Sequence, residues 1–299
     1  DAILWDTGHQ AYIHKLVTGR RGGFAQLRQA GGLSGYPSRE ESVHDFIENS
    51  HASTVLSYAH GMAVARDKGQ PADRRHVVAV IGDGSLTGGM AYEALNNLGH
   101  SKSRVIIVLN DNGRSYAPTV SNLVHHPHPL DETSEMSRPR DRLTRRLSRA
   151  LTNVRLNPVY VQRQRRLERW LHDLPVVGPQ AERGLEAVKA GIREYLQPTA
   201  FFEALGVRYV GPIDGHDVKS LVDTIRNMRN LKGPQLLHVV TKKGKGYLPA
   251  EQDPIGYHAV SKFDPTAQCQ PAKKAGKATF SNIFGQWICD MAAVDPKLQ

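Results

Sequence analysis

Residues 76–112 of this chain read HVVAVIGDGSLTGGMAYEALNNLGHSKSRVIIVLNDN and are its most informative part. It contains two apolar runs, at 76–81 and 104–109, and each run is followed by a short polar motif. The residues between the runs begin with Gly82-Asp83-Gly84 and continue in a helical pattern over 85–98. A strand, a crossover helix and a return strand predict two parallel strands of one sheet.

The two polar motifs, Gly82-Asp83-Gly84 and Asn110-Asp111-Asn112, are expected to meet at the carboxyl edge of that sheet. Carboxylate and amide oxygens are ligands that Mg²⁺ prefers, and phosphate oxygens and water usually complete the shell. Asp83 and Asn112 supply such oxygens, while Gly84 lets backbone N–H groups approach a phosphate. The pair of motifs therefore predicts a magnesium diphosphate site, whereas a lone GDG would favour an ordinary strand–turn–helix corner.

The rest of the chain continues the alternation of strands and helices. Strands are expected at 2–5, 207–210 and 235–241, and helices at 51–68, 201–205, 218–231 and 279–293. Such alternation predicts an α/β fold, a doubly wound parallel sheet with helices on both faces. Ligands of these sheets bind at the carboxyl ends of the strands, where we expect Gly84, Asn112, Gly211 and Lys243.

The formal net charge of +10 at pH 7 is concentrated in one region. Residues 138–169 contain eleven arginines against Asp141 and Glu168, a net charge of +9. Leucines recur at helical spacing between these arginines, which favours amphipathic helices with a solvated basic face over a nucleic-acid surface. The histidine-rich run at 125–129 is typical of a solvated loop rather than a metal site. We therefore expect no nucleic-acid partner.

The cysteines and the apolar runs indicate the cellular compartment of the protein. Cys269 and Cys289 lack CxxC spacing, so they predict neither a disulfide framework nor a zinc site. A reducing cytoplasm fits this usage. No apolar run reaches the roughly 20 residues that a membrane-spanning helix requires, so we expect no membrane association.

Six sequence motifs, taken in their order along the chain, resemble those of a known enzyme family. They are DTGHQAY at 6–12, GGLSGYP at 31–37, SHAST at 50–54, GDGSLTGGMAYEALNN at 82–97, GPIDGHD at 211–217 and TKKGKGY at 241–247. With them the chain resembles the 1-deoxy-D-xylulose-5-phosphate synthase family, which belongs to the transketolase-like thiamine diphosphate enzymes. The resemblance extends over the chain except for residues 120–190, which read as a basic helical insertion.

The resemblance implies a site for thiamine diphosphate and Mg²⁺. The implied metal ligands are the side chains of Asp83 and Asn112 and the backbone carbonyl of Arg114. The implied cofactor contacts are His9, Ser50, His51, Ala52, Gly84, Ser85, Asn112, Lys243, Tyr247 and His258. Of these, His9 and His51 are expected to be catalytic, because an imidazole can transfer protons near neutral pH.

One motif departs from the family. Many members have a methionine in the sequence NDNxMSI, whereas this chain has Asn112-Gly113-Arg114-Ser115-Tyr116. A ligand that acts through its backbone carbonyl tolerates this change. If the methionine side chain mattered, the assignment of Arg114 would fail.

The activity implied by the resemblance is the condensation of pyruvate, with loss of CO2, and D-glyceraldehyde 3-phosphate. The product is 1-deoxy-D-xylulose 5-phosphate, a precursor of isoprenoids, thiamine and pyridoxal, and family members are homodimers. Two alternatives stay open, a transketolase-type two-carbon transferase and a non-catalytic cofactor-binding or dimerisation module.

The resemblance also implies a domain organisation. It divides the chain into a diphosphate-binding domain at 1–261, a linker at 262–278 and the start of a pyrimidine-binding domain at 279–299. The glutamate that activates the cofactor is then expected beyond Gln299. We accordingly expect these 299 residues alone to be inactive.

Overall fold

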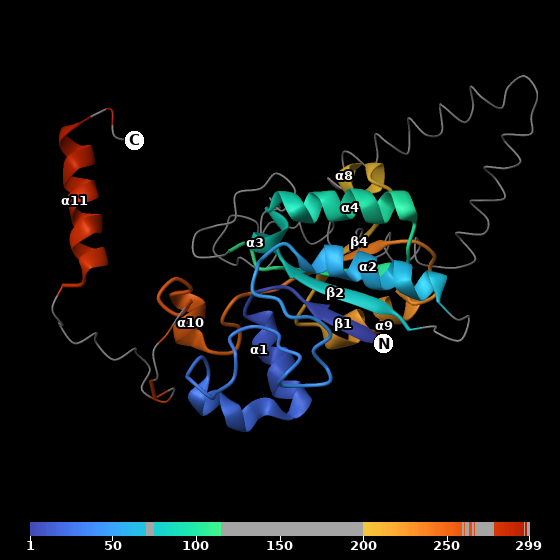
Figure 1. Ribbon diagram of the computed structural model, residues 1–299, viewed down its shortest axis with the longest axis horizontal. Coiled ribbons are helices and arrows are strands. Elements are labelled where there is room, and N and C mark those ends of the chain that lie inside the picture. Colours follow the sequence, from blue (N-terminus) through green and yellow to red (C-terminus); the bar gives the residue numbers. More distant parts are fainter. Residues whose placement is uncertain are drawn as a thin grey trace, which may run out of the picture. The chain divides into compact units, whose positions relative to one another are not determined.

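The computed structural model describes residues 1–69, 75–114, 200–258 and 278–295, together with residues 260, 263, 264, 266 and 297 (Figure 1). The basic insertion expected at 120–190, with its histidine-rich and arginine-rich runs, lies outside these residues, as do most of the 262–278 segment and Cys269. The chain divides into two compact units, Asp1–Lys243 and Gly244–Gln299.

Five parallel strands form the sheet of the first unit (Figure 1). They are β1 (Ala2–Trp5), β2 (Val77–Gly82), β3 (Val105–Asp111), β4 (Arg208–Asp214) and β5 (Gln235–Val240). Their order across the sheet is β1-β2-β3-β5-β4, and every neighbouring pair is parallel. All five carboxyl ends therefore lie along one edge of the sheet.

Helices cover both faces of this sheet. α2 (Val55–Lys68) and α4 (Gly89–Ser101) lie side by side on one face, together with α8 (Ala200–Ala204) (Figure 1). A buried apolar cluster joins these helices to the strands; it includes Leu56, Leu95, Phe202, Ala79 and Ile107. α9 (Val218–Met228) packs on the opposite face, where Met228 joins a second cluster with Ile106, Leu237 and Val239. The predicted doubly wound α/β fold is confirmed.

The helix expected over 85–98 is in fact two helices. α3 (Asp83–Leu86) and α4 are separated by Thr87 and Gly88. A Cβ atom on Gly88 would lie only 2.1 Å from the Ser53 hydroxyl oxygen, so the break allows the chain to pass closely against Ser53. Gly88 thus permits a close approach between two segments that a side chain would block.

Two further expectations need correction. α2 begins at Val55 and not at His51, because Ser53 has a φ of +74° that a helix cannot contain. Gly211 does not lie at a strand end. It lies inside β4, where the register with β5 shifts between Val210 and Ile213.

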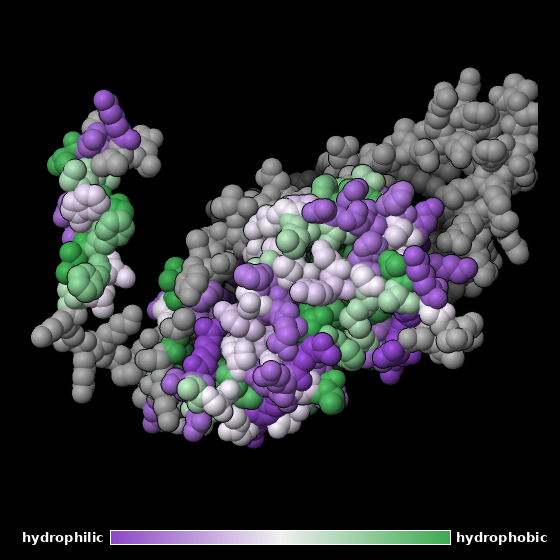
Figure 2. Space-filling view, viewed as in Figure 1, coloured by the Kyte–Doolittle hydropathy of each residue, from purple (hydrophilic) through white to green (hydrophobic). Residues whose placement is uncertain are grey.

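The second unit contains two described helices, α10 (Leu248–Gln252) and α11 (Phe280–Val294). Thr279 caps α11, and Thr279 and Asn282 together form a capping box. The helix expected at 279–293 is thus confirmed, and its apolar side chains are exposed (Figure 2): Phe280, Ile283, Phe284, Trp287 and Ile288.

No helix among the described residues combines the length and the apolar character needed to cross a membrane.

Candidate functional site

The two polar motifs leave the sheet from neighbouring strands at the same edge. In the register of β2 and β3, Gly82 lies opposite Asn110. Asp83, which begins α3, is 2% exposed, and Asn112 follows the last residue of β3. The Asn112 Oδ1 atom accepts a hydrogen bond from the backbone N–H of Arg114 at 3.1 Å, so the three residues 112–114 form a tight turn.

A third strand brings a cation to this edge. Lys243 lies three residues after the end of β5, and Thr241, the first residue after the strand, donates from its hydroxyl group to Asn110 Oδ1 at 2.9 Å. Burial lowers the pKa of Lys243, the charge of Asp83 opposes this effect, and the charge of Arg114 adds to it. Lys243 therefore lies within electrostatic reach of both Asp83 and Arg114, and the ends of β2, β3 and β5 share one polar neighbourhood.

The donor atoms at this edge suit a hard divalent cation. Among the described residues, no group of three or more His, Cys, Asp or Glu side chains could hold a metal ion. A metal here would need amide and carbonyl oxygens beside the carboxylate of Asp83. Asn112 and the carbonyl of Arg114 offer these oxygens, and such a set matches Mg²⁺ bound together with phosphate and water.

Asp6, at the end of β1, holds the SHAST segment. Its carboxylate is fully buried and accepts hydrogen bonds from the backbone N–H groups of Ser53 at 3.1 Å and Val55 at 3.0 Å. Burial raises the pKa of Asp6, and these hydrogen bonds oppose the rise. The contacts fix the turn in which His51 lies and provide an acceptor for the first N–H group of α2.

Further contacts connect this turn to α3 and β1. Asn49 donates from its side-chain amide to the Trp5 carbonyl at 3.2 Å and accepts from the His51 N–H at 3.3 Å. The Ser53 hydroxyl donates to the carbonyl of Ser85 at 2.6 Å. The structure thus brings the predicted segments 50–52 and 84–85 together. The side chains of Ser50, His51 and Ala52 are exposed.

His9 lies at the start of the neighbouring helix. It is the N-terminal flanking residue of α1 (Gln10–Lys15), it is exposed, and its ring lies 5.7 Å from that of Tyr12. Because α1 follows β1 through the loop 6–9, His9 leaves the sheet from the same edge as Asp83. Its helix is held in turn by charged residues further along the chain.

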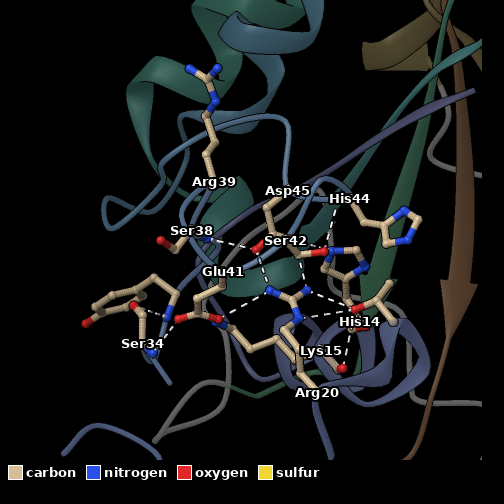
Figure 3. Close-up of polar contacts among 12 residues, drawn as sticks. His14, Lys15, Arg20, Ser34, Ser38, Arg39, Glu41, Ser42, His44 and Asp45 are labelled. Carbon is tan, nitrogen blue, oxygen red and sulfur yellow. Dashed lines mark hydrogen bonds and ion pairs between the residues drawn. The ribbon is translucent and has the colours of Figure 1, made fainter. Parts of the chain in front are cut away.

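A buried ionic cluster fixes α1 to the segment 34–45 (Figure 3). It consists of His14, Lys15, Arg20, Glu41 and Asp45. Arg20 lies between the two carboxylates and donates to Asp45 at 2.8 and 2.9 Å and to Glu41 at 3.3 Å, while fully buried Lys15 pairs with Glu41. The same carboxylates accept from the backbone N–H groups of Ser34 and Ser38, so the cluster holds the GGLSGYP loop against α1.

The pKa values of this cluster follow from its burial and charges. Burial lowers the pKa of His14, against the opposing effect of Asp45. Burial would raise the pKa of Asp45, yet hydrogen bonds from Arg20, Ser38 and His14 bring it below its usual value of 3.8. At neutral pH the cluster therefore contains a charged Asp45 and a neutral His14.

Two of the residues implied by the resemblance belong to the second unit. Tyr247 precedes α10, and its hydroxyl oxygen is buried without a hydrogen-bond partner among the described residues. Its ring lies 5.7 Å from the ring of Tyr257. His258 lies in the turn after α10, where its N–H donates to the Ile255 carbonyl. A buried hydroxyl of this kind suits a ligand oxygen.

Sequence reasoning missed the residues that support this edge. Asp6 and Asp111 each stand next to an apolar run, as Asp83 does, so an acidic residue at a strand end was an available signal. The ionic cluster had no comparable signal, because its members are 21 to 31 residues apart and join only through the tertiary fold.

Comparisons with known proteins place the chain in one family. A family model described as 1-deoxy-D-xylulose-5-phosphate synthase matches residues 1–150 and 143–241. The chain is 48% identical over 299 residues to the 1-deoxy-D-xylulose-5-phosphate synthase of Pseudoalteromonas translucida, and 46% identical over 298 residues to that of Shewanella loihica. Each comparison covers 100% of this chain and 43% of the relative, so the chain spans less than half the length of these relatives.

A solved structure is also similar. Transketolase from Leishmania mexicana matches with 16% sequence identity and a TM-score of 0.49. That comparison covers 81% of this chain and 28% of the transketolase chain.

Proposed function

Because the chain belongs to the 1-deoxy-D-xylulose-5-phosphate synthase family, we propose that the full-length protein condenses pyruvate with D-glyceraldehyde 3-phosphate, releasing CO2 and 1-deoxy-D-xylulose 5-phosphate. One observation in the structure carries this proposal. Asp83 and the 112–114 turn leave adjacent parallel strands, with Lys243 in electrostatic reach. This edge has the donor atoms for a divalent cation and the positive charge for a diphosphate.

We propose Asp83, Asn112 and the carbonyl of Arg114 as the protein ligands of Mg²⁺. Gly84, Ser85 and Lys243 are then proposed to bind the diphosphate of thiamine diphosphate. Tyr247 and His258 stay predicted cofactor contacts. When bound, thiamine diphosphate supplies the electron sink that the loss of CO2 from a 2-keto acid requires. The buried hydroxyl of Tyr247 supports its part in this assignment, because it lacks a hydrogen-bond partner among the described residues.

His9 and His51 are proposed to transfer protons to and from the carbonyl oxygens of the substrates. Both are exposed residues on segments fixed at the sheet edge, His51 by Asp6 and Asn49 and His9 by α1. General acid–base groups of this kind contribute roughly 10²–10⁴-fold to a rate. We expect His9→Ala and His51→Ala each to lower turnover by a factor in that range, with thiamine diphosphate affinity changed much less.

The remaining parts of the proposal concern the whole protein. We propose residues 1–261 as the diphosphate-binding domain, 262–278 as a linker and 279–299 as part of a second domain. The exposed apolar side of α11 supports a partner surface for that helix. We further propose a homodimer that works in the cytoplasm, with the activating glutamate outside these 299 residues.

The test uses the full-length protein with pyruvate, D-glyceraldehyde 3-phosphate, thiamine diphosphate and Mg²⁺. We expect CO2 and 1-deoxy-D-xylulose 5-phosphate in equal amounts, and a nearly complete loss of both in Asp83→Asn. A ketose phosphate offered as the donor in place of pyruvate should give no product. Product formation from the ketose phosphate but not from pyruvate would assign a two-carbon transferase instead.

A further inference from the structure

A chain of buried hydrogen bonds runs across three strands beneath the 112–114 turn. The Tyr209 hydroxyl on β4 lies 2.6 Å from His238 Nδ1 on β5, and His238 Nε2 lies 2.8 Å from Asp111 Oδ2 on β3. The three side chains are 7%, 2% and 4% exposed. A polar chain this deep in an apolar core is costly to leave unsatisfied, which makes its partners and their geometry specific.

The direction of these hydrogen bonds follows from the chemistry of the groups. An ionised carboxylate only accepts, so His238 donates to Asp111 from Nε2–H and its Nδ1 remains an acceptor. Tyr209 then donates its O–H to Nδ1. Burial and the negative charge of Asp111 raise the pKa of Tyr209, which agrees with a hydroxyl that stays protonated. Tyr209 thus orients the ring of His238, and the ring in turn orients the carboxylate of Asp111.

This series of hydrogen bonds leads to the turn that is proposed to bind the metal. The second carboxylate oxygen of Asp111, Oδ1, accepts a hydrogen bond from the Gly113 N–H at 2.9 Å. Gly113 has a φ of +68°, a conformation that glycine adopts readily. Asn112 lies between the two partners of this bond. The Asp111 carboxylate therefore sets the path of the backbone that carries Asn112 and Arg114.

The backbone of Asp111 is held as well. Its carbonyl accepts from the Thr241 N–H at 2.7 Å, in continuation of the β3–β5 pairing. Because the strand backbone is fixed, Asp111 can change its conformation only by rotation about its side-chain bonds. His238 restricts this rotation, because its hydrogen bond to Oδ2 leaves Oδ1 facing the Gly113 N–H.

We propose that His238, supported by Tyr209, is a positioning residue for the metal site, acting through Asp111 on the turn that carries Asn112 and the carbonyl of Arg114. The inference depends on the proposed function, because it concerns the metal assigned there. Partners one step removed from metal ligands commonly change metal affinity roughly 10–100-fold when they are replaced. We expect an effect of that size for His238.

The experiment is a calorimetric titration of Mg²⁺ into the full-length protein at saturating thiamine diphosphate. His238→Leu removes both ring nitrogens and should weaken Mg²⁺ binding roughly 10–100-fold. His238→Gln places an amide N–H near the position of Nε2 and should restore most of the affinity. Tyr209→Phe removes only the support of the ring and should weaken binding by less than His238→Leu.

Two further variants separate the possible outcomes. Gln235→Met changes another buried polar side chain of β5, one whose amide contacts the Leu231 carbonyl at 3.3 Å. It controls for a general loss of stability and should leave Mg²⁺ affinity unchanged. Asp83→Asn removes a proposed ligand and should weaken Mg²⁺ binding whether or not His238 takes part.

The inference is overturned if His238→Leu keeps wild-type Mg²⁺ affinity while Asp83→Asn loses it. It is also overturned if Gln235→Met weakens binding as much as His238→Leu, or if His238→Gln fails to restore affinity although it folds. Unchanged Mg²⁺ binding in Asp83→Asn would instead contradict the proposed function itself, so the two failures are distinguishable.

Discussion

The carboxylate of Asp6 accepts a hydrogen bond at 3.1 Å from the backbone N–H of Ser53, a residue 47 positions further along the chain. Ser53 has a φ of +74°, and its hydroxyl reaches the carbonyl of Ser85 at 2.6 Å. One buried acid at the end of β1 thereby orders the turn that contains His51 and connects it to α3. The site is assembled from strand ends by such contacts.

Replacement of Asp6 should be destabilising. Asp6→Ala leaves the N–H groups of Ser53 and Val55 buried without acceptors, and such groups cost about 1–3 kcal/mol. We expect the free energy of opening of the 50–55 segment to fall by about that amount, measured by amide hydrogen exchange in the full-length protein. Asp223→Ala, on an exposed surface, should change exchange by less than about 0.5 kcal/mol. Equal effects of the two variants would contradict this role.

Removal of Arg20 should release the GGLSGYP loop from α1. Arg20→Met leaves the buried carboxylate of Asp45 without its main cation, and breaking a buried ion pair commonly costs about 3–5 kcal/mol. We expect much faster amide exchange at Ser34 and Ser38, whose N–H groups donate to Glu41 and Asp45. Arg21→Met, at the exposed neighbouring position, serves as the matched control and should leave these amides protected.

The same cluster should weaken on acidification. Burial lowers the pKa of His14 below 6.5, so the unfolded segment binds more protons and stability is lost as the pH falls below about 6.5. The lowered pKa of Asp45 has the same sign, with stability lost below its ordinary value of 3.8. We expect protection of the 34–45 amides, corrected for intrinsic exchange, to decrease between pH 7.5 and 5. His14→Gln should remove the decrease in that range; an unchanged decrease would assign it to another group.

Two glycines in neighbouring helices should respond in opposite directions to alanine. A Cβ on Gly99 of α4 would lie 1.6 Å from the Leu205 carbonyl oxygen, so Gly99→Ala must displace backbone and should destabilise strongly. A Cβ on Gly61 of α2 meets nothing within 4 Å, so Gly61→Ala should stabilise by up to about 1 kcal/mol. Thermal unfolding of the full-length protein measures both; a stabilising Gly99→Ala would contradict the packing of α4.

The sequence was informative where local pattern decides the structure. The runs at 76–81 and 104–109 predicted β2 and β3 to within two residues, since buried parallel strands are continuously apolar. The helix expected at 279–293 was equally readable, whereas its Thr279–Asn282 capping box was not predicted. The family motifs located the residues proposed for metal and diphosphate binding, whose roles stay predictions.

The sequence was uninformative where distant residues meet. The start of α2 was misplaced because Asp6, rather than any neighbour of His51, sets the conformation of Ser53. The break before α4 follows from the close approach of Gly88 to Ser53. The contact of His238 with Asp111 joins residues 127 positions apart, and each stands in or beside an apolar run that suggests no partner.

The role of Asp83 in binding the ion is tested by calorimetric binding of thiamine diphosphate to the full-length protein, with and without Mg²⁺, in the wild type and in Asp83→Asn. We expect the wild type to bind the cofactor tightly only when Mg²⁺ is present, because Asp83 and the 112–114 turn hold the ion that the diphosphate shares. In Asp83→Asn this dependence on Mg²⁺ should disappear together with tight binding. Wild-type affinity and an unchanged Mg²⁺ dependence in Asp83→Asn would contradict a metal site at Asp83.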